Sequence, residues 1–172
     1  MCRALLILAI SVLVGCAGPT TTDQTELLNI KLSNRLPKSS PSQFVAAFDK
    51  YCVEEKSPSA RESLLRNANY VPVAPKRPNE PQVFPVDDRR PAVVVSDRLC
   101  SVRALSRTGQ TQRLSSYIEE KFQIFQPLPR NFVGSEVEQL WQIADYKPAL
   151  IATDRGHTID GLTTYAVTIF RP

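Results

Sequence analysis

The single histidine of this chain stands between two carboxylates. His157 follows Asp154 and precedes Asp160, in a segment that also contains two glycines. A histidine beside carboxylates can act as a general base or as a metal ligand, and a distant serine would complete a Ser-His-Asp arrangement. No G-x-S-x-G motif accompanies it, and this composition is typical of a turn. We therefore expect a loop over residues 154–161, with no catalytic residue and no metal site.

Three groups of neighbouring charges and one set of aromatic residues are the other candidates. Adjacent acids on a helix do not face each other, so the two acid pairs do not favour paired-carboxylate chemistry. A run of mixed charge could bind an ion or a partner, but a solvated, self-neutralising loop is the favoured interpretation. The aromatic residues could form a sugar-binding platform, with core packing as the favoured alternative. These groups are Glu54-Glu55, Glu119-Glu120, Asp87-Asp88-Arg89-Arg90, and Trp141 with Tyr146 and Tyr165.

The first fifteen residues have the composition of an export signal. Met1-Cys2-Arg3 is a short positive start, and Ala4 to Gly15 is an apolar stretch of twelve residues without a charge. Crossing a bilayer takes about 20 apolar residues, so this stretch is too short to span one. We predict that residues 1–15 are a signal peptide that is removed.

The end of this stretch, Leu13-Val14-Gly15-Cys16, resembles the lipobox of bacterial prolipoproteins. The resemblance implies that the Cys16 thiol receives a diacylglyceryl group and that a peptidase cuts before Cys16. It also implies that the new amino group can be acylated in turn, for example with palmitate. Each buried methylene contributes ~0.8 kcal/mol, so two or three chains anchor a protein firmly. By analogy with enterobacterial sorting, Ala17 after the cysteine favours the outer membrane; an ordinary signal peptide is the alternative.

Loss of Cys2 with the signal and lipidation of Cys16 leave two of the four cysteines. Cys52 and Cys100 are not in a C-x-x-C spacing and have no neighbouring histidine, so neither zinc nor haem is indicated. In an oxidising periplasm such a pair is more often a disulfide. We predict a Cys52–Cys100 bridge, with two separately buried thiols as the alternative.

Capping signals and apolar spacing predict three helices. Ser40, Pro41 and Gln43 combine an N-cap, a proline at the first helical position and a glutamine that completes a capping box. Ser59 should cap a second helix of about ten residues, after Ser57-Pro58 ends the first. The third helix should span residues 111–123, ending before Pro127 and Pro129. The apolar face of the first helix should comprise Phe44, Phe48, Tyr51 and Cys52.

Alternation and β-branched runs predict five strands. Two of them should form a hairpin that turns at residues 96–98, and three should form a meander. The prolines between residues 72 and 91 favour a loop, with an edge strand at residues 83–86, over a proline-rich ligand for a partner. The five predicted strands are residues 92–95, 99–105, 136–144, 149–153 and 162–170.

Together these elements predict an α+β fold, with a mostly antiparallel sheet of about five strands and two or three helices packed on one face. The expected organisation is a signal peptide at residues 1–15, the lipidated cysteine and a tether at residues 16–36, and a single α+β domain at residues 37–172. Apart from the lipobox, the body loosely resembles small, uncharacterised envelope proteins of proteobacteria with one cysteine in an early helix and another in a following strand. That resemblance implies no particular function.

The net charge of +4 falls to +3 once Arg3 is removed, which is too mild to predict nucleic-acid binding. We expect a non-catalytic periplasmic lipoprotein without a cofactor, held at the outer membrane by its lipid, that binds or scaffolds another envelope protein. A periplasmic hydrolase and a glycan-binding module are the alternatives. An enzyme should present a polar cleft in which His157 meets a buried carboxylate or a serine, whereas a scaffold should present a flat apolar patch.

Overall fold

The computed structural model describes residues 25–26, 29, 36–54, 57–73, 80–122, 124–127, 136–144, 149–159 and 161–171, without the side chains of 124–127 and 157–159. The predicted signal peptide, the lipobox with Cys16, and most of the predicted tether lie outside these residues. Within them, no helix combines the length and the apolar character needed to cross a bilayer.

The first described helix, α2 (Pro41–Phe48), begins with the predicted capping box. The amide of Gln43 donates to Ser40 Oγ at 3.2 Å, and the amide of Ser40 donates to Gln43 Oε1 at 3.3 Å. The helix continues directly into a π-helical turn, η2 (Asp49–Val53), which extends the same apolar face. The predicted start of this helix and its buried side are confirmed.

The second described helix, α3 (Pro58–Asn67), is capped by Ser57. The amide of Ala60 donates to Ser57 Oγ at 3.3 Å. The prediction that Ser59 is the cap is wrong, because Pro58, with its fixed φ and no N–H to satisfy, suits the first helical position. The third helix, α4 (Gln110–Lys121), follows Gly109, whose φ of 83° is left-handed and suits glycine.

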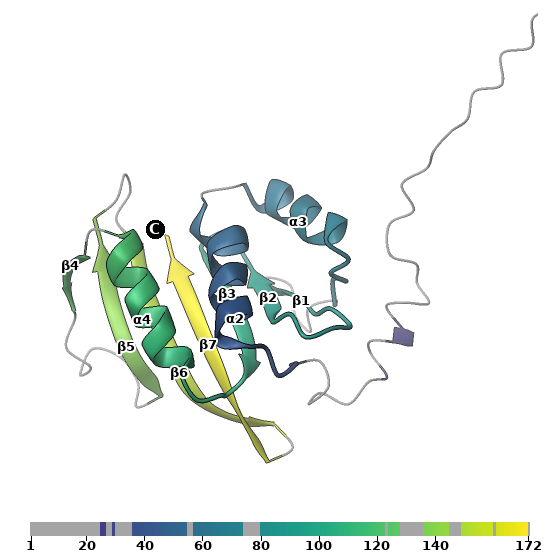
Figure 1. Cartoon of the computed structure of the whole chain (residues 1–172). Coiled ribbons are helices and arrows are strands. Elements are labelled where there is room, and N and C mark those ends of the chain that lie inside the picture. The colour runs from purple at the N-terminus through teal and green to yellow at the C-terminus, as the bar shows by residue number, and fades with distance from the viewer. Residues whose placement is uncertain are drawn as a thin grey trace, which may run out of the picture.

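Among the described residues, seven strands form one antiparallel sheet in the order β1-β2-β3-β7-β6-β5-β4 (Figure 1). The predicted α+β class is confirmed, with seven strands where the sequence predicts about five. The predicted hairpin is formed by β2 and β3, and the predicted meander by β5, β6 and β7. The strands are β1 (Gln82–Phe84), β2 (Ala92–Val95), β3 (Leu99–Leu105), β4 (Ile124–Pro127), β5 (Val137–Ile143), β6 (Ala149–Ile159) and β7 (Leu162–Phe170).

Two parts of the sheet differ from the sequence prediction. The strand β6 continues to Ile159 and pairs with β7 along that length, so the loop predicted to begin at Asp154 is wrong. A shift of register between Arg155 and Thr158 marks a bulge, which interrupts the alternation that would have signalled a strand. The strand β4 contains Pro127, which a strand tolerates at the edge of a sheet, where β4 lies.

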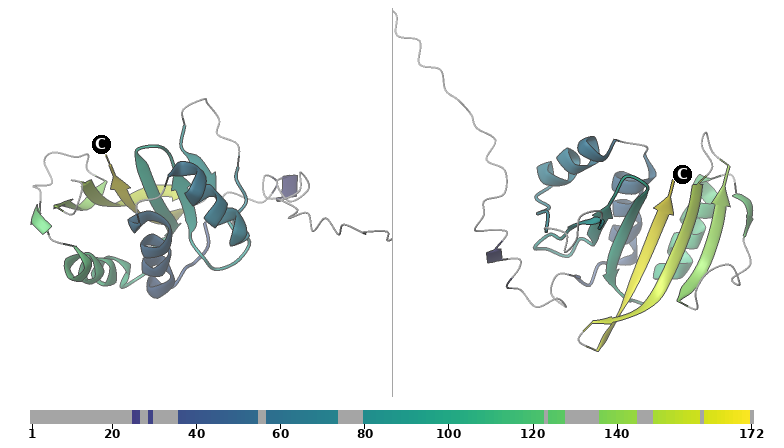
Figure 2. Two further views of the ribbon diagram at one scale, coloured as in Figure 1. Left: turned by 90° about the horizontal axis from the view of Figure 1, so that it is seen from above. Right: turned by 180° about the vertical axis from the view of Figure 1, so that it is seen from behind.

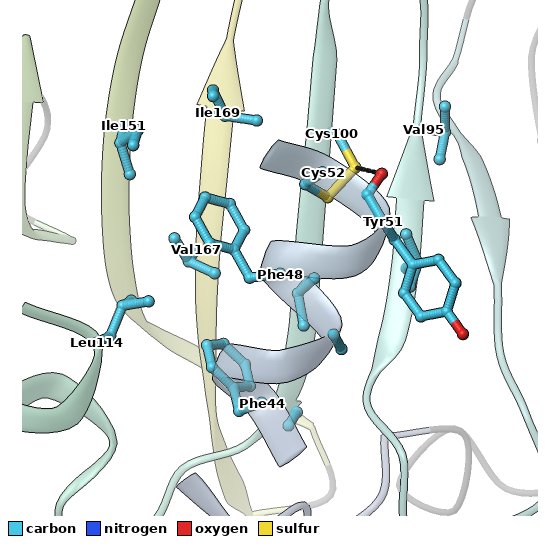
Figure 3. Packing of buried hydrophobic residues seen from close by; sticks show 14 of the residues in the cluster. Phe44, Phe48, Tyr51, Cys52, Val95, Cys100, Leu114, Ile151, Val167 and Ile169 are labelled. Carbon is cyan, nitrogen blue, oxygen red and sulfur yellow. Dashed lines mark hydrogen bonds between the residues drawn. A yellow bond between two sulfur atoms is a disulfide. The ribbon is translucent and has the colours of Figure 1, made fainter. Parts of the chain in front are cut away.

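The helices α2 and α4 lie on the same face of the sheet, and no described helix covers the opposite face (Figure 2). The covered face is the main core. The helical side chains Phe44 and Phe48 are fully buried and point toward Val167 and Ile169 of the central strand β7 (Figure 3). Burial of each such side chain contributes about 1.5–3 kcal/mol, so this layer contact stabilises both the helix and the sheet.

A disulfide joins the end of this helix to the sheet. Cys52 of η2 and Cys100 of β3 are bonded, with their Cα atoms 5.3 Å apart and both side chains fully buried. The π-helical turn places Cys52 directly over β3 (Figure 3). The expected loss of chain entropy on closing a loop with a sequence separation of 48 makes this bridge a large part of the stability of a small domain.

Two arginines hold the same helix end by its carbonyl groups. Arg61 Nε of α3 donates to the Tyr51 carbonyl at 2.9 Å, and the Arg61 side chain is buried. Arg171, which follows β7, donates from Nη2 to the carbonyls of Cys52 at 2.9 Å and Val53 at 2.7 Å. The last carbonyls of a helix have no partner within it, and these arginines supply partners from the next helix and from the far end of β7.

Removal of the bridge by the double substitution Cys52→Ala and Cys100→Ala is expected to lower the free energy of unfolding by about 4 kcal/mol, because the unfolded chain regains the freedom of the closed loop. Chemical denaturation followed by circular dichroism measures this change. A reducing agent should weaken the unsubstituted protein by a similar amount and leave the double variant unaffected. Equal sensitivity of the two proteins to the reductant would contradict the prediction.

Candidate functional site

The main polar cluster between α4 and the sheet is built around Arg155 of β6. Its Nε donates to Glu138 Oε1 at 2.5 Å, its Nη1 to Ser106 Oγ, and its Nη2 to Thr111 Oγ1 at 3.0 Å. Its guanidinium carbon lies 4.8 Å from the centre of the Tyr165 ring. These contacts use all three guanidinium nitrogens and hold the start of α4 against β5 and β6. We call Arg155 and its partners Glu138, Ser106 and Thr111 the Arg155 clamp.

Thr111, the second residue of α4, contacts both Arg155 and Glu138. Thr111 Oγ1 donates to Glu138 Oε2 at 3.0 Å, so Glu138 receives hydrogen bonds from both the helix and the neighbouring strand. One turn further along, Ser115 Oγ donates to Gln139 Oε1 at 2.7 Å. Sequence analysis missed this network, because Arg155 was assigned to a loop and its partners come from distant segments.

Two buried hydroxyl groups lie in the core beside this clamp. Tyr165 and Thr153 are fully buried, and neither hydroxyl has a hydrogen-bond partner among the described residues. Burial raises the pKa of Tyr165, while the nearby hydroxyls of Thr111 and Thr153, which are outside hydrogen-bonding geometry, act in the opposite direction. A buried polar group without a partner costs about 1–3 kcal/mol, so this tyrosine keeps its hydroxyl at the expense of stability.

The backbone of His157 lies in β6, within the bulge that follows Arg155, and not in a loop. Its side chain and Asp160 lie outside the described part of the chain, whereas the neighbouring Arg155 points into the clamp. Within the described residues, no group of three or more histidine, cysteine, aspartate or glutamate side chains is placed to hold a metal ion.

The aromatic platform, the alternative to core packing, is not formed by Trp141 and Tyr165. Trp141 and Tyr165 are both buried in the core, on the helix-covered face of β5 and β7. Tyr146 lies outside the described residues. Core packing, the favoured interpretation of the first two aromatic residues, is therefore what the structure has.

The run of mixed charge at residues 87–90 pairs with itself and with α3. Arg90 Nη2 lies 2.6 Å from Asp88 Oδ2, while Arg90 Nη1 donates to the Ala68 carbonyl at 2.8 Å. Partial burial acts to raise the pKa of Asp88, but the hydrogen bonds from Arg90 outweigh it and lower that pKa. Arg90 also lies over the Tyr70 ring, 5.0 Å from its centre. These contacts fasten the loop to the domain.

A shallow hollow of about 610 Å³ runs between α2 and α4 on the outer surface of the helical layer. It is lined by Val45 of α2 and by Arg113 and Tyr117 of α4, among others. The Tyr117 hydroxyl donates to Asp49, and burial together with this hydrogen bond raises the pKa of Tyr117. The Tyr117 hydroxyl is thus already engaged within the protein.

The helix-free face of the sheet presents a different kind of surface. Side chains alternate between the two faces of a strand, so the neighbours of the core residues Tyr165 and Val167 lie on this side of β7. We call the helix-free side of β3, β7 and the first half of β6 the open face. Its members are Leu99, Ser101, Arg103, Leu105, Leu162, Thr164, Ala166, Thr168, Phe170, Leu150, Ala152 and Asp154.

The open face carries the exposed large hydrophobic side chains of the described residues. These are Leu150, Leu162 and Phe170, which are 38%, 40% and 41% exposed. Leu150 and Phe170 are direct cross-strand partners, so their side chains lie side by side. Single exposed apolar residues such as Leu162, at the opposite end of β7, are common, whereas the adjacent pair Leu150 and Phe170 marks a candidate interaction surface. In the sequence, this surface was signalled by Leu162 and Phe170, the large apolar residues that alternate with the core-facing residues of the last strand.

Removal of the Tyr165 hydroxyl by Tyr165→Phe is expected to leave the free energy of unfolding unchanged or to raise it by up to about 1 kcal/mol, because no hydrogen bond is lost. The matched control is Tyr70→Phe, which removes the buried hydrogen bond from the Tyr70 hydroxyl to the Pro91 carbonyl at 3.1 Å. That control should lose about 1–2 kcal/mol in the same denaturation experiment. A greater loss for Tyr165→Phe than for Tyr70→Phe would contradict the assignment.

Comparison of the chain with protein-family models, with curated proteins and with solved structures gives no significant match. Its function has therefore to be inferred from its own surface chemistry. The Arg155 clamp and the open face are the two features that bear on it, one directed inward and the other outward.

Proposed function

We propose that this chain is a non-catalytic, lipid-anchored binding protein of the bacterial envelope. In this proposal Cys16 carries the lipid, the domain lies on the periplasmic side of the outer membrane, and the open face is the surface that binds another envelope component. The exposed pair Leu150 and Phe170 on the open face carries the proposal, because an exposed apolar pair is what a scaffold is expected to present.

The shape and composition of the open face support binding of a protein surface. Its central residues Ala166, Thr168 and Ala152 are buried, and the exposed side chains Leu150 and Phe170 stand together at one end. An exposed apolar pair of this kind suits an apolar patch on a partner, since both side chains gain by burial. Burial of the exposed parts of such side chains contributes roughly 25 cal/mol per Å².

The Arg155 clamp supports a binding function over a catalytic one. Its guanidinium is engaged by Glu138, Ser106 and Thr111, and its charge is balanced by the carboxylate of Glu138. A catalytic cation or base has to be available to substrate, whereas this cluster is satisfied by the protein itself. It serves to set α4 on the sheet, and thereby keeps the helices on the face opposite the binding surface.

The anchor and the disulfide fit one compartment. A lipidated Cys16 would hold the chain at a membrane outside the cytosol, where a buried Cys52–Cys100 bridge is stable. The residues after Cys16 begin Ala-Gly-Pro-Thr-Thr-Thr, a composition suited to a tether between lipid and domain. In this proposal the export signal at residues 1–15 accounts both for the location of the chain and for the disulfide between Cys52 and Cys100.

The substitution Cys16→Ser is expected to abolish incorporation of labelled palmitate and to leave an uncleaved precursor or a protein absent from the membrane fraction, because no thioether can form. Metabolic labelling and fractionation of cells producing the full chain measure both effects. Cys2→Ser is the matched control and should be lipidated normally. Membrane fractionation and labelling of Cys16→Ser equal to those of the unsubstituted chain would refute the anchor.

The substitution Leu150→Glu is expected to reduce crosslinking of the full chain to envelope partners in intact cells by about tenfold, because it places a charge in the apolar part of the open face. Thr163→Glu is the control, since Thr163 is an exposed residue of β7 outside the open face. Both variants should keep the unfolding transition of the unsubstituted protein. An unchanged crosslinking pattern for Leu150→Glu would refute the assignment of the open face.

A further inference from the structure

One end of the domain contains the point where the chain enters it, the starts of α2 and α4, and the turn between β6 and β7 (Figure 1). Hydrogen bonds join these parts. Ser39 Oγ of the entering segment donates to the Arg89 carbonyl at 2.6 Å. The amide of Ser106, which follows β3, donates to the Thr163 carbonyl at 2.8 Å. We call this end, which comprises residues 36–41, 87–90, 106–113 and 161–163, the entry end.

Exposed basic side chains gather on the entry end. Lys38 lies in the entering segment, Arg89 in the loop before β2, and Arg107 in the turn before α4. Arg107 Nη1 donates to the Lys38 carbonyl at 3.4 Å, so these two residues lie side by side. Arg113, in the first turn of α4, lines the hollow together with Pro41 of α2. The entry end therefore collects positive charge from four separate segments.

This positive charge is not balanced by acids of the same end. Within the described part of the chain, Lys38, Arg89, Arg107 and Arg113 take part in no ion pair. The acidic residues among the described members of the entry end are Asp87 and Asp88, and Asp88 is paired with Arg90. The basic side chains are thus exposed and available to an outside anion.

An exposed apolar side chain lies at the same end. Leu162 is the first residue of β7 and is 40% exposed, and it follows Gly161, whose φ of 77° allows the tight turn from β6. A single exposed leucine says little by itself. A leucine at the tip of a hairpin with basic side chains around it, however, suits a phospholipid surface, because the cations meet phosphates while the leucine enters the acyl boundary.

We propose that the entry end is a docking surface for the anionic membrane to which the chain is tethered. This inference rests on the proposed function, in which Cys16 carries the lipid. About 20 residues separate Cys16 from Leu36, and a chain of that length spans at most roughly 70 Å. The domain therefore stays near the membrane at a high effective concentration, which favours even a weak contact. The tether joins the domain at the entry end, so this end is the one closest to the lipid.

Docking through the entry end gives the binding function an orientation. Each lysine or arginine near an anionic lipid surface strengthens the contact about fivefold, so the cluster selects this end over the others. Leu162 and Phe170 are the first and last residues of β7, a strand of nine residues, and lie roughly 26 Å apart. With Leu162 at the membrane, the exposed pair Leu150 and Phe170 is held away from the lipid, where another envelope component can reach it.

The test introduces a tryptophan at the entry end of the full chain, whose single native tryptophan, Trp141, is buried. Leu162→Trp, purified with its lipid, is reconstituted in vesicles of phosphatidylcholine and phosphatidylglycerol with brominated acyl chains, which quench tryptophan fluorescence on contact. We expect strong quenching, which should be lost in vesicles of brominated phosphatidylcholine alone. Phe170→Trp is the matched control at the other end of β7 and should be quenched no more than the unsubstituted chain.

Charge reversal tests the basic cluster in the Leu162→Trp chain. Lys38→Glu together with Arg113→Glu should reduce the quenching about fivefold or more, because both changes repel the anionic surface. Arg98→Glu together with Lys50→Glu is the matched control, with the same change in net charge. Arg98 and Lys50 are exposed at the far end, beside Arg171 and in η2, so this pair should leave the quenching unchanged. High salt should weaken the quenching by screening, and circular dichroism checks that the variants fold.

The docking surface is overturned if Leu162→Trp is quenched no more than Phe170→Trp, or if the two charge-reversed pairs behave alike. Sedimentation of the vesicles reports separately on the anchor. If the chain sediments with vesicles of both compositions but Leu162→Trp is not quenched, the anchor stands and the docking surface fails. If the chain sediments only with the anionic vesicles and Leu162→Trp is quenched there, the docking surface stands and the anchor fails. If it sediments with neither, both fail.

Discussion

The structure depends on how the carbonyl end of the first helix is held against the sheet. The carbonyls of residues 51–53 end a helix that lies over the core, and leaving each buried group without a partner would cost about 1–3 kcal/mol. Arg61 reaches them from α3 and Arg171 from the residue after β7, so two segments more than 100 residues apart meet at one point. The bond between Cys52 and Cys100 adds a covalent link there.

This attachment also determines what the other side of the sheet looks like. Arg171 directly follows β7, the strand whose residues Tyr165 and Val167 pack under the helices. Since successive residues of a strand face opposite sides, holding the helices on one side leaves Ala166 and Phe170 on the other. The core and the open face are thus two sides of the same strand, and a change of register in β7 would alter both.

Local signals predicted the elements whose limits depend on neighbouring residues, such as the helix capped by Ser40 and the hairpin around residues 96–98. The extension of β6 beyond Asp154 depends on a bulge, and the strand β4 depends on a place at the edge of the sheet. Both features come from how strands pair with one another, so the sequence of the segment alone does not reveal them. Alternation likewise places Phe170 and Tyr165 on opposite faces of β7, but the packing of the helices decides which of the two side chains is exposed (Figure 2). That Leu150 lies beside Phe170 follows only from the register of β6 and β7.

The two edges of the sheet have a consequence for polymerisation. One edge strand, β4, contains Pro127, which has no amide hydrogen to offer to an incoming strand. The other, β1, has only three residues, and the isolated bridge from Val73 to Val83 occupies part of its outer side. Both edge strands are therefore poor templates for pairing with another chain. The sheet thus resists growth into open-ended fibres by strand addition, even where molecules are crowded together.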